Sequence, residues 1–192
     1  MVSESGTERE GMMAGDFIVE QIRTPVRYTC DTVVCGGGTA GFAAALAAAR
    51  NGAKTILVER FGYVGGTLVN GAGPLHSFYN LYKAFPEAPK QQVVQGIPQE
   101  IIERMMAAGG SPGHLEQDKG GSYDSVITIV DWELFKDVAF AMLEEAGVTV
   151  LLHTMIVGAL MDGARVTGIV TEGKSGREAI RAGVVIDATG DA

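Results

Sequence analysis

Cysteine is scarce in this sequence: Cys30 and Cys35 are the only two among 192 residues. No Cys-x-x-Cys spacing is present, so we predict neither a metal site nor an iron–sulfur cluster. Both cysteines fall on one predicted strand, five residues apart, so we expect their side chains to face opposite sides and form no disulfide. Cys35 borders a glycine-rich turn, where a small buried hydrophobe is favoured over a reactive thiol. This usage indicates a reducing, cytoplasmic setting.

The sequence also lacks an excess of positive charge and any long apolar run. The 15 basic side chains face 23 acidic ones, giving a formal net charge of −8, which opposes binding to nucleic acid. No apolar run approaches the length that spans a membrane. Residues 1–16 lack the apolar core of a signal peptide. We therefore expect a soluble protein with no nucleic-acid or membrane partner, in which residues 1–28 form a tail and an extended lead-in arm.

Glycine, by contrast, is abundant, with 27 residues. An apolar run, residues 32–35, leads into the turn Gly-Gly-Gly-Thr-Ala-Gly at residues 36–41, and an alanine-rich segment follows. A second apolar run, residues 55–58, stops at Glu59. Strand, glycine turn, helix, strand and acid follow in the order that a dinucleotide-binding βαβ unit requires, and a tight structural turn is the alternative.

Each position in this unit has a physical role. Gly36 lets the chain turn sharply off the strand, and Gly41 lets the helix pack closely on the sheet. Gly38 has no side chain, so the backbone can approach a pyrophosphate at the positive end of the helix. Glu59 can accept hydrogen bonds from both hydroxyl groups of an adenosine ribose.

A second glycine turn follows, with Gly65 and Gly66 in the segment 60–67. A domain that binds only a nicotinamide cofactor has no need for it, whereas a cofactor with a ribityl chain and a larger ring needs backbone to pass close by. An ordinary loop is the alternative. Residues 70–130 are rich in glycine, proline and aromatics, with a short helix from Pro98 to Gly109, an irregular segment over 111–121 and a strand over 125–130. We interpret residues 70–130 as an insertion that covers the cofactor and the substrate side.

The remaining chain predicts one helix and four strands. Asp131 is a candidate N-cap for a helix that ends at Gly147. The following apolar runs predict one strand that returns to the parallel sheet, a β-meander, and a last buried strand: 148–153, 154–161, 165–171 and 179–186. The fold class is therefore α/β, a Rossmann-like parallel sheet with a β-meander crossover, with residues 29–192 as one nucleotide-binding domain.

Together, the turn at 36–41, the second turn at 60–67 and the ending Asp187-Ala188-Thr189-Gly190 resemble FAD-dependent oxidoreductases of the glutathione-reductase-like two-dinucleotide-binding superfamily. The nearest likeness is to members of the heterodisulfide-reductase flavin-subunit type, and it spans roughly residues 28–192. The resemblance implies FAD as cofactor and the following contacts: Gly36, Gly38, Thr39, Ala40 and Gly41 at the pyrophosphate; Glu59 and Arg60 at the adenosine; Gly65, Gly66 and Thr67 at the ribityl–flavin part; Ile156 at the adenine edge; and Ala188, Thr189 and Gly190 where the chain returns to the cofactor.

Two departures from the family pattern carry expectations. No histidine directly follows the Gly65-Gly66 pair, as it does in flavoproteins that tether FAD covalently, so we expect non-covalent FAD. The family normally continues well past the Ala-Thr-Gly turn with a substrate domain. We therefore expect a fold that is incomplete at the C-terminus, with a missing C-terminal half or a partner chain and a possible homo-oligomer.

No catalytic acid or base is evident from the sequence. His76 follows the second glycine turn and is the candidate for proton transfer; the alternative is a solvent-facing or hydrogen-bonded loop histidine. The favoured function is an FAD-dependent oxidoreductase that transfers electrons or hydride between a small-molecule substrate or redox carrier and a second acceptor. The alternatives are a non-catalytic FAD- or nucleotide-binding subunit that needs a partner, and an NAD-dependent dehydrogenase.

Overall fold

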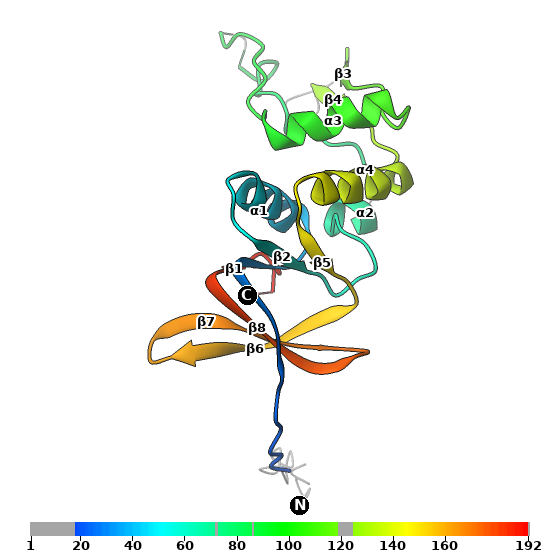
Figure 1. The fold of residues 1–192 in the computed structure, drawn as a ribbon. Helices are drawn as coiled ribbons and strands as arrows, with labels where there is room; N and C mark the ends of the chain where they lie inside the picture. Colours follow the sequence, from blue (N-terminus) through cyan, green and yellow to red (C-terminus); the bar gives the residue numbers. More distant parts are fainter. Residues whose placement is uncertain (1–17, 72, 86, 119–124, 192) are drawn as a thin grey trace, which may run out of the picture.

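A computed structural model of the chain describes residues 18–71, 73–85, 87–118 and 125–191. Its centre is a six-stranded sheet in the order β5-β2-β1-β8-β7-β6 (Figure 1). Four of these strands are parallel: β1 (Val26–Cys35), β2 (Thr55–Val58), β5 (Thr149–Leu151) and β8 (Gly176–Asp187). The other two, β6 (Thr154–Asp162) and β7 (Arg165–Gly173), run antiparallel and form a meander that ends in β8. The predicted α/β fold with a β-meander crossover is confirmed.

The two strands at the centre of the fold, β2 and residues 32–35 of β1, form because their apolar runs are buried on both faces. All four residues of β2 are buried, and Val34 in β1 pairs with Leu57 on one side and Ile186 on the other. Such continuous apolar runs are typical of parallel strands, which are covered by other elements on each face. β1 lies between β2 and β8, so the carboxyl end of β1 is at the centre of this edge of the sheet.

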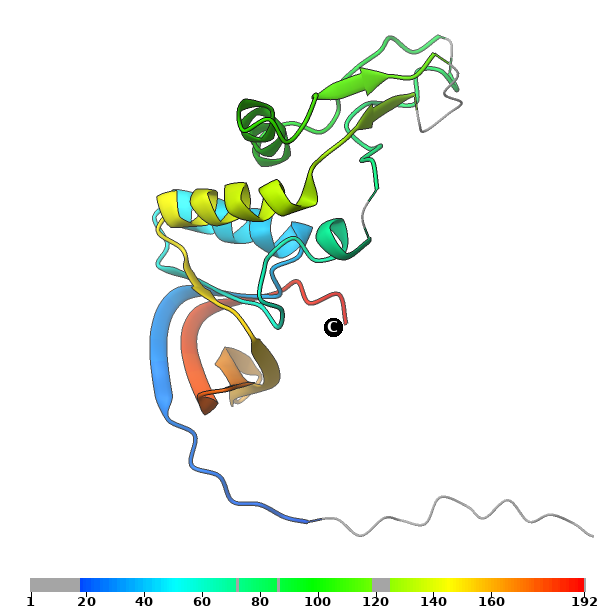
Figure 2. The same cartoon turned by 90° about the vertical axis from the view of Figure 1, so that its right-hand side faces the viewer.

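Two helices cover one face of the parallel strands, α1 (Thr39–Arg50) and α4 (Trp132–Glu145), and Figure 2 shows them running alongside each other. α1 buries Phe42 and Leu46 against this face. α4 begins after Asp131, as predicted: the Asp131 carboxylate accepts hydrogen bonds from the backbone N–H groups of Glu133 and Leu134, at 2.9 and 3.1 Å.

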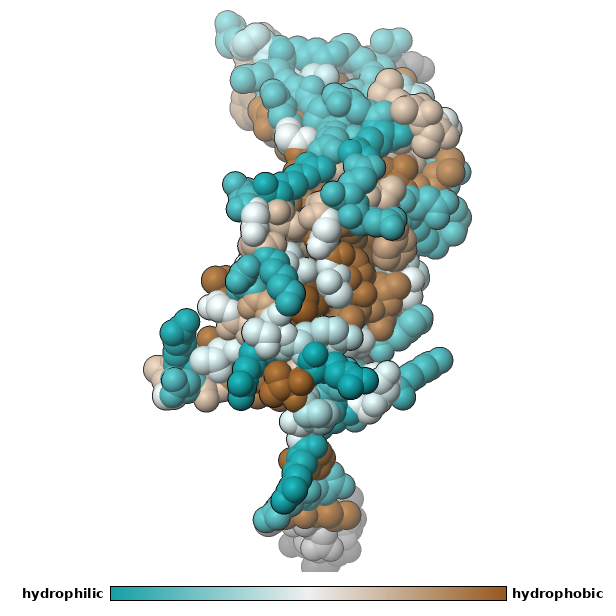
Figure 3. Space-filling view, viewed as in Figure 1, coloured by the Kyte–Doolittle hydropathy of each residue, from teal (hydrophilic) through white to brown (hydrophobic). Residues whose placement is uncertain are grey.

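The insertion, residues 70–130, lies beyond α4 in Figure 1. It begins at the end of the short helix α2 (Thr67–Gly71) and contains the helix α3 (Ile97–Ala107). It also contains β3 (His114–Glu116), which pairs antiparallel with β4 (Val126–Thr128). The irregular segment predicted over 111–121 is therefore wrong at β3, because pairing with β4 fixes a strand that has no apolar alternation of its own. In Figure 3, hydrophilic side chains cover most of the insertion, and hydrophobic surface gathers between the helices and the meander.

The lead-in arm and the two cysteines show how β1 begins. Residues 18–25 form no helix or strand, and the predicted tail, residues 1–16, lies outside the described residues. Both cysteines are free and buried, as expected, but they belong to the same core cluster, so the expectation of opposite faces is wrong. Between them, the N–H groups of Asp31 and Thr32 both donate to the Lys54 carbonyl, at 3.0 and 3.2 Å, so the backbone departs from the regular hydrogen-bond alternation there.

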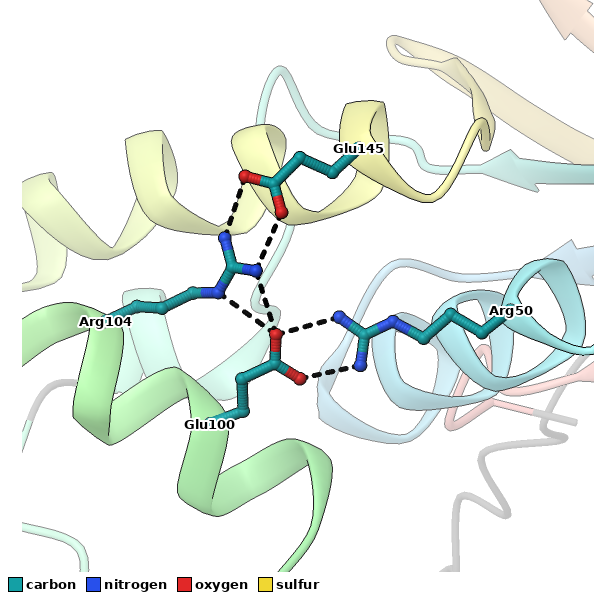
Figure 4. Close-up of polar contacts among 4 residues, drawn as sticks. All are labelled: Arg50, Glu100, Arg104 and Glu145. Carbon is teal, nitrogen blue, oxygen red and sulfur yellow. Dashed lines mark hydrogen bonds and ion pairs between the residues drawn. The ribbon is translucent and has the colours of Figure 1, made fainter.

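An ion-pair network joins three helices on the side of α3 that faces α1 and α4 (Figure 4). Glu100 in α3 pairs with Arg50 at the end of α1, at 2.6 Å, and Arg104 pairs with Glu145 in α4, at 2.7 Å. The Arg50 guanidinium lowers the pKa of Glu100, and the Arg104 guanidinium lowers that of Glu145. The side chains are partly exposed, so each pair by itself stabilises the fold only modestly. Together, these two ion pairs hold α3 against α1 and α4.

His114 connects β3 to the rest of the insertion. Its Nδ1 lies 2.7 Å from Thr128 Oγ1, and its Nε2 lies 2.9 Å from Gln99 Oε1. The Phe78 ring centroid is 4.7 Å away. The amide oxygen of Gln99 only accepts, so Nε2 carries a proton. Burial lowers the pKa of His114.

This burial predicts a pH dependence of stability. The folded state favours neutral His114, so the unfolded chain binds a proton more readily and stability rises with pH. The His114 contribution is complete above the ordinary histidine pKa of about 6.5 and is lost as the pH falls through the lower folded value. We expect the melting temperature to fall less steeply between about pH 7.5 and 5.5 in His114→Gln than in the unmodified chain. Thermal denaturation checks this, and equal slopes would contradict it.

Candidate dinucleotide-binding site

Three turns converge where the parallel strands end. The Gly36 N–H donates to the Val58 carbonyl at 2.8 Å, and the Ala188 N–H donates to the Cys35 carbonyl at 2.8 Å. The second glycine turn joins them, because the Gly65 N–H donates to the Gly37 carbonyl at 2.7 Å. The structure thus brings together three sequence segments that the chain separates widely.

Two glycines of the first turn are needed by the packing of the protein itself. Gly36 has φ +91°, and a Cβ on it would lie 2.7 Å from the Ala188 carbonyl oxygen. A Cβ on Gly41 would lie 1.8 Å from the Gly36 carbonyl oxygen. Both distances are too short for any real contact, so α1 approaches the end of β1 this closely only with glycine at both positions.

Gly38 differs from these two glycines. A Cβ there would meet no atom of the described residues within 4 Å, and the backbone φ of −66° suits any residue. Gly38 is the N-cap of α1, and Thr39 and Ala40, which follow it, are exposed. The unpaired N–H groups and the positive end of the α1 dipole therefore face open space, as a pyrophosphate requires. The turn fits the group that the sequence implies.

Glu59 directly follows β2 and is only 5% exposed. Its Oε2 accepts a hydrogen bond from the Gly37 N–H at 2.6 Å, and its Oε1 accepts one from the Phe61 N–H at 2.8 Å. Sequence reasoning assigned Glu59 to a ribose and missed the bond to Gly37. The signal in the sequence was a run of three consecutive glycines. A Cβ on the middle one, Gly37, would lie 3.1 Å from Glu59 Oε2 and 3.0 Å from Val64 Cγ1.

The two hydrogen bonds predict a dual effect for Glu59→Ala. The substitution leaves the N–H groups of Gly37 and Phe61 without their acceptor, so both the fold and the first glycine turn lose support. We expect FAD binding to weaken by about 1–3 kcal/mol and the melting temperature to fall as well. Isothermal titration with FAD and thermal denaturation measure the two effects separately. Glu59→Gln, which keeps one acceptor oxygen, should lose less of both, and an effect larger than that of alanine would contradict this role.

A cavity of about 120 Å³ opens beside Glu59. Its lining residues come from the turn after β1, the end of β2, the start of β6 and the turn after β8: Gly36, Glu59, Arg60, Met155, Ile156, Thr189 and Asp191. Five of the seven are residues that the sequence resemblance placed at the cofactor, and the structure brings them together. Met155 and Asp191 were missed. Asp191 pairs with Arg60 at 3.4 Å, a contact between segments that no local pattern joins.

The second glycine turn lies directly against the first. Gly65 and Gly66 have φ of +116° and +52°, and a Cβ on Gly66 would lie 2.9 Å from Gly38 Cα. The preceding segment is held by stacked rings: Phe61 and Tyr63 are 5.7 Å apart with planes 7° apart, and the Lys136 Nζ lies 4.8 Å from the Tyr63 ring centroid. Lys136 belongs to α4, so this stack fixes the turn to the helix layer.

The third turn is held by Asp187. Its Oδ1 accepts hydrogen bonds from the Thr189 N–H and hydroxyl group, at 3.0 and 2.7 Å, and these bonds lower the pKa of the Asp187 carboxyl. Burial, followed by the nearby Asp187 charge, raises the pKa of the Cys35 thiol to about 11. Cys35 is therefore a protonated, buried side chain and no reactive thiol.

The sequence also predicts His76 as the candidate for proton transfer. His76 lines a second cavity of about 420 Å³, together with Thr39 and Gly65.

Within the described residues, no cluster of three or more histidine, cysteine or carboxylate side chains could hold a metal ion. The same part of the chain contains no helix that is long and apolar enough to cross a membrane.

The fold and the three converging turns define a dinucleotide-binding domain of the flavoprotein type. The family model described as FAD dependent oxidoreductase matches residues 31–192, so the chain belongs to the FAD-dependent oxidoreductase family, whose cofactor is FAD. The resemblance seen in the sequence is confirmed at the level of the family.

Individual relatives agree with this assignment. Over 107 residues the chain is 33% identical to a fumarate reductase (cytochrome) of Shewanella frigidimarina, covering 54% of this chain and 17% of the relative. Over 164 residues it is 30% identical to a digeranylgeranylglycerophospholipid reductase of Methanothrix thermoacetophila, covering 84% and 37%. The chain thus spans well under half the length of these two relatives.

Solved structures share the fold at lower sequence identity. The open conformation of a flavocytochrome c3 fumarate reductase superposes with a TM-score of 0.58 at 19% identity, over 84% of this chain and 34% of that one. THI4 of Thermovibrio ammonificans superposes with a TM-score of 0.56 at 18% identity, over 84% and 57%.

Proposed function

We propose that this chain holds FAD non-covalently in an enzyme that transfers electrons or hydride between a small-molecule substrate or redox carrier and a second acceptor. The observation that carries the proposal is the meeting of three turns around open space at the start of α1, beside the cavity at Glu59. Bound FAD supplies the redox chemistry, and the protein supplies position, polarity and exclusion of water.

The positions of the predicted residues support a division of roles. The turn at 36–41 would hold the pyrophosphate, since Gly38 leaves its path open. Glu59, Arg60 and Ile156 would surround the adenosine, because they line one cavity. The second turn, with Thr67, would pass along the ribityl–flavin part, and Ala188, Thr189 and Gly190 would close the site from the other side. His76 is the candidate for proton transfer.

Three further features of the proposal follow from the sequence. FAD would be non-covalent, because Thr67, not histidine, follows the glycine pair. The insertion, residues 70–130, would cover the flavin and the substrate side. A cytoplasmic setting is consistent with two free cysteines.

Purified protein tests the proposal directly. We expect a yellow protein that releases all of its flavin on acid precipitation and whose melting temperature rises with added FAD but not with NAD. Stabilisation by NAD alone would overturn the proposal in favour of a nicotinamide-dependent dehydrogenase. Tightly bound FAD together with reduction of a dye by a substrate would overturn the non-catalytic alternative.

A further inference from the structure

A large cavity lies between three helices and the segment after the second glycine turn. Its volume is about 420 Å³, within the range of roughly 300–1,000 Å³ that small-molecule sites occupy. α1, α3, α4 and the start of the insertion all contribute to its wall, for example with Phe42, Ala43, His76, Ile101, Trp132 and Phe135. The ion-pair network at Glu100 and Arg104 fixes α3, and thereby holds this wall in place.

The wall of this cavity is chemically simple. Among the described residues, no aspartate, glutamate, lysine or arginine lines it, and the polar side chains of its wall include Thr39, His76 and Ser77. An ionised ligand would lose its hydration there without gaining a charged partner from these residues, so the cavity favours an uncharged one. All three polar side chains can donate a hydrogen bond.

Aromatic rings form one side of the cavity. The Phe42 and Phe135 centroids are 6.3 Å apart with planes 56° apart, and the Trp132 and Phe135 centroids are 6.2 Å apart with planes 66° apart. Phe42 and Phe135 are each only 2% exposed, so these rings are rigidly packed. Inclined rings at these spacings offer both faces and edges to a flat ligand.

The cavity adjoins the proposed path of FAD. Thr39 opens α1 directly after the Gly38 cap, and Gly65 belongs to the second glycine turn, yet both also line this cavity. A ligand bound here would therefore lie next to the cofactor without occupying the cavity at Glu59, whose lining is a separate set of residues.

We propose that this cavity binds an uncharged, largely apolar organic molecule with a flat ring and at least one hydrogen-bond acceptor, such as a carbonyl oxygen. Placing it beside FAD rests on the proposed function, since it makes this molecule the substrate or electron acceptor of the enzyme. His76, with Thr39 and Ser77, supplies the donors that orient the acceptor atom.

Trp132 provides a direct reporter, because it is the only tryptophan in the chain and lines the cavity. The probe is menadione, an uncharged methylnaphthoquinone, titrated into FAD-loaded protein while Trp132 fluorescence is followed. We expect saturable quenching. The same ring bearing a sulfonate group, 1,4-naphthoquinone-2-sulfonate, should bind much more weakly, and equal binding of the two probes would overturn the assignment to an uncharged ligand.

A matched pair of substitutions on α1 locates the binding. Ala43 lines the cavity, whereas Ala47 is exposed on the same helix. Ala43→Leu should weaken menadione binding by roughly tenfold or more, and Ala47→Leu should leave it unchanged. Ile101→Phe fills the cavity from α3 and replaces Ala43→Leu if that variant does not fold. Wild-type menadione affinity in a folded, cavity-filled variant would overturn the proposal.

The same titrations separate this inference from the proposed function. FAD and menadione should bind together, and mutual exclusion would overturn the inference by assigning the cavity to the flavin itself. Menadione binding that Ala43→Leu weakens, in a chain that does not bind FAD, would contradict the proposed function and still support the cavity as a ligand site.

Discussion

Gly38→Val is expected to give a folded, colourless protein. A Cβ at this position meets no atom of the described residues within 4 Å, and φ of −66° suits valine, so the fold should lose no more than about 1 kcal/mol from the altered helix cap. The branched side chain would instead project into the open space at the start of α1. A pyrophosphate could no longer approach the N–H groups there, and the protein should retain no FAD on purification.

The measurement is the ratio of flavin absorbance to protein, together with circular dichroism and the melting temperature without FAD. Gly158→Val is the matched control: a Cβ on Gly158, in β6, would make an ordinary contact at 3.8 Å with Val170. It should keep its flavin. Equal FAD occupancy in Gly38→Val and Gly158→Val would remove the assignment of the first glycine turn to the pyrophosphate.

Gly41→Ala is expected to have the opposite effect, a damaged fold in a turn whose ligand side is unchanged. The added Cβ would lie 1.8 Å from the Gly36 carbonyl oxygen, which belongs to the backbone and cannot rotate away. Either α1 or the end of β1 must move. We expect a loss of about 3 kcal/mol or more, at the upper end of overpacking costs. For a chain of this length, that lowers the melting temperature by roughly 6–12 °C.

Thermal denaturation of the FAD-free proteins measures this loss. Gly38→Ala places the same methyl group three residues earlier in the same turn, where it meets no atom of the described residues within 4 Å. The melting temperature of this variant should be close to that of the unmodified protein. A melting temperature for Gly41→Ala equal to that of Gly38→Ala would show that α1 does not pack on Gly36 as described. The two glycines of one motif thus separate ligand access from packing.

Much of the fold follows from the sequence because its signals are local and strong. The apolar run of β2, the alanines of α1 and the Asp131 cap each specify their element within a few residues. β3 was missed because its three residues are fixed by β4, not by their own pattern. The prediction for the faces of Cys30 and Cys35 was wrong because the irregularity at Asp31 and Thr32 depends on the Lys54 carbonyl, which is distant in the sequence.

The candidate site likewise has some residues that the sequence predicts and some contacts that it does not. Motif spacing identified Gly36 and Glu59, and the family resemblance implied Ile156; the structure places all three around one cavity. Sequence reasoning missed the bond from Gly37 to Glu59, since it depends on how two strand ends meet. It also missed the apolar cavity at Trp132, because the residues of that wall come from five segments whose meeting only the tertiary structure determines.

The meeting of Gly36 with Ala188 has a consequence for the order of folding. β8 pairs with β1 on one edge and with β7 on the other, so every residue from β1 to β8 must be synthesised before these strands can pair. Such distant pairing slows folding, because the entropy of closing a long loop is lost before the contact forms. The third turn is therefore the last of the three turns to form. With this turn as part of the proposed FAD site, we expect flavin uptake during refolding to report the docking of β8.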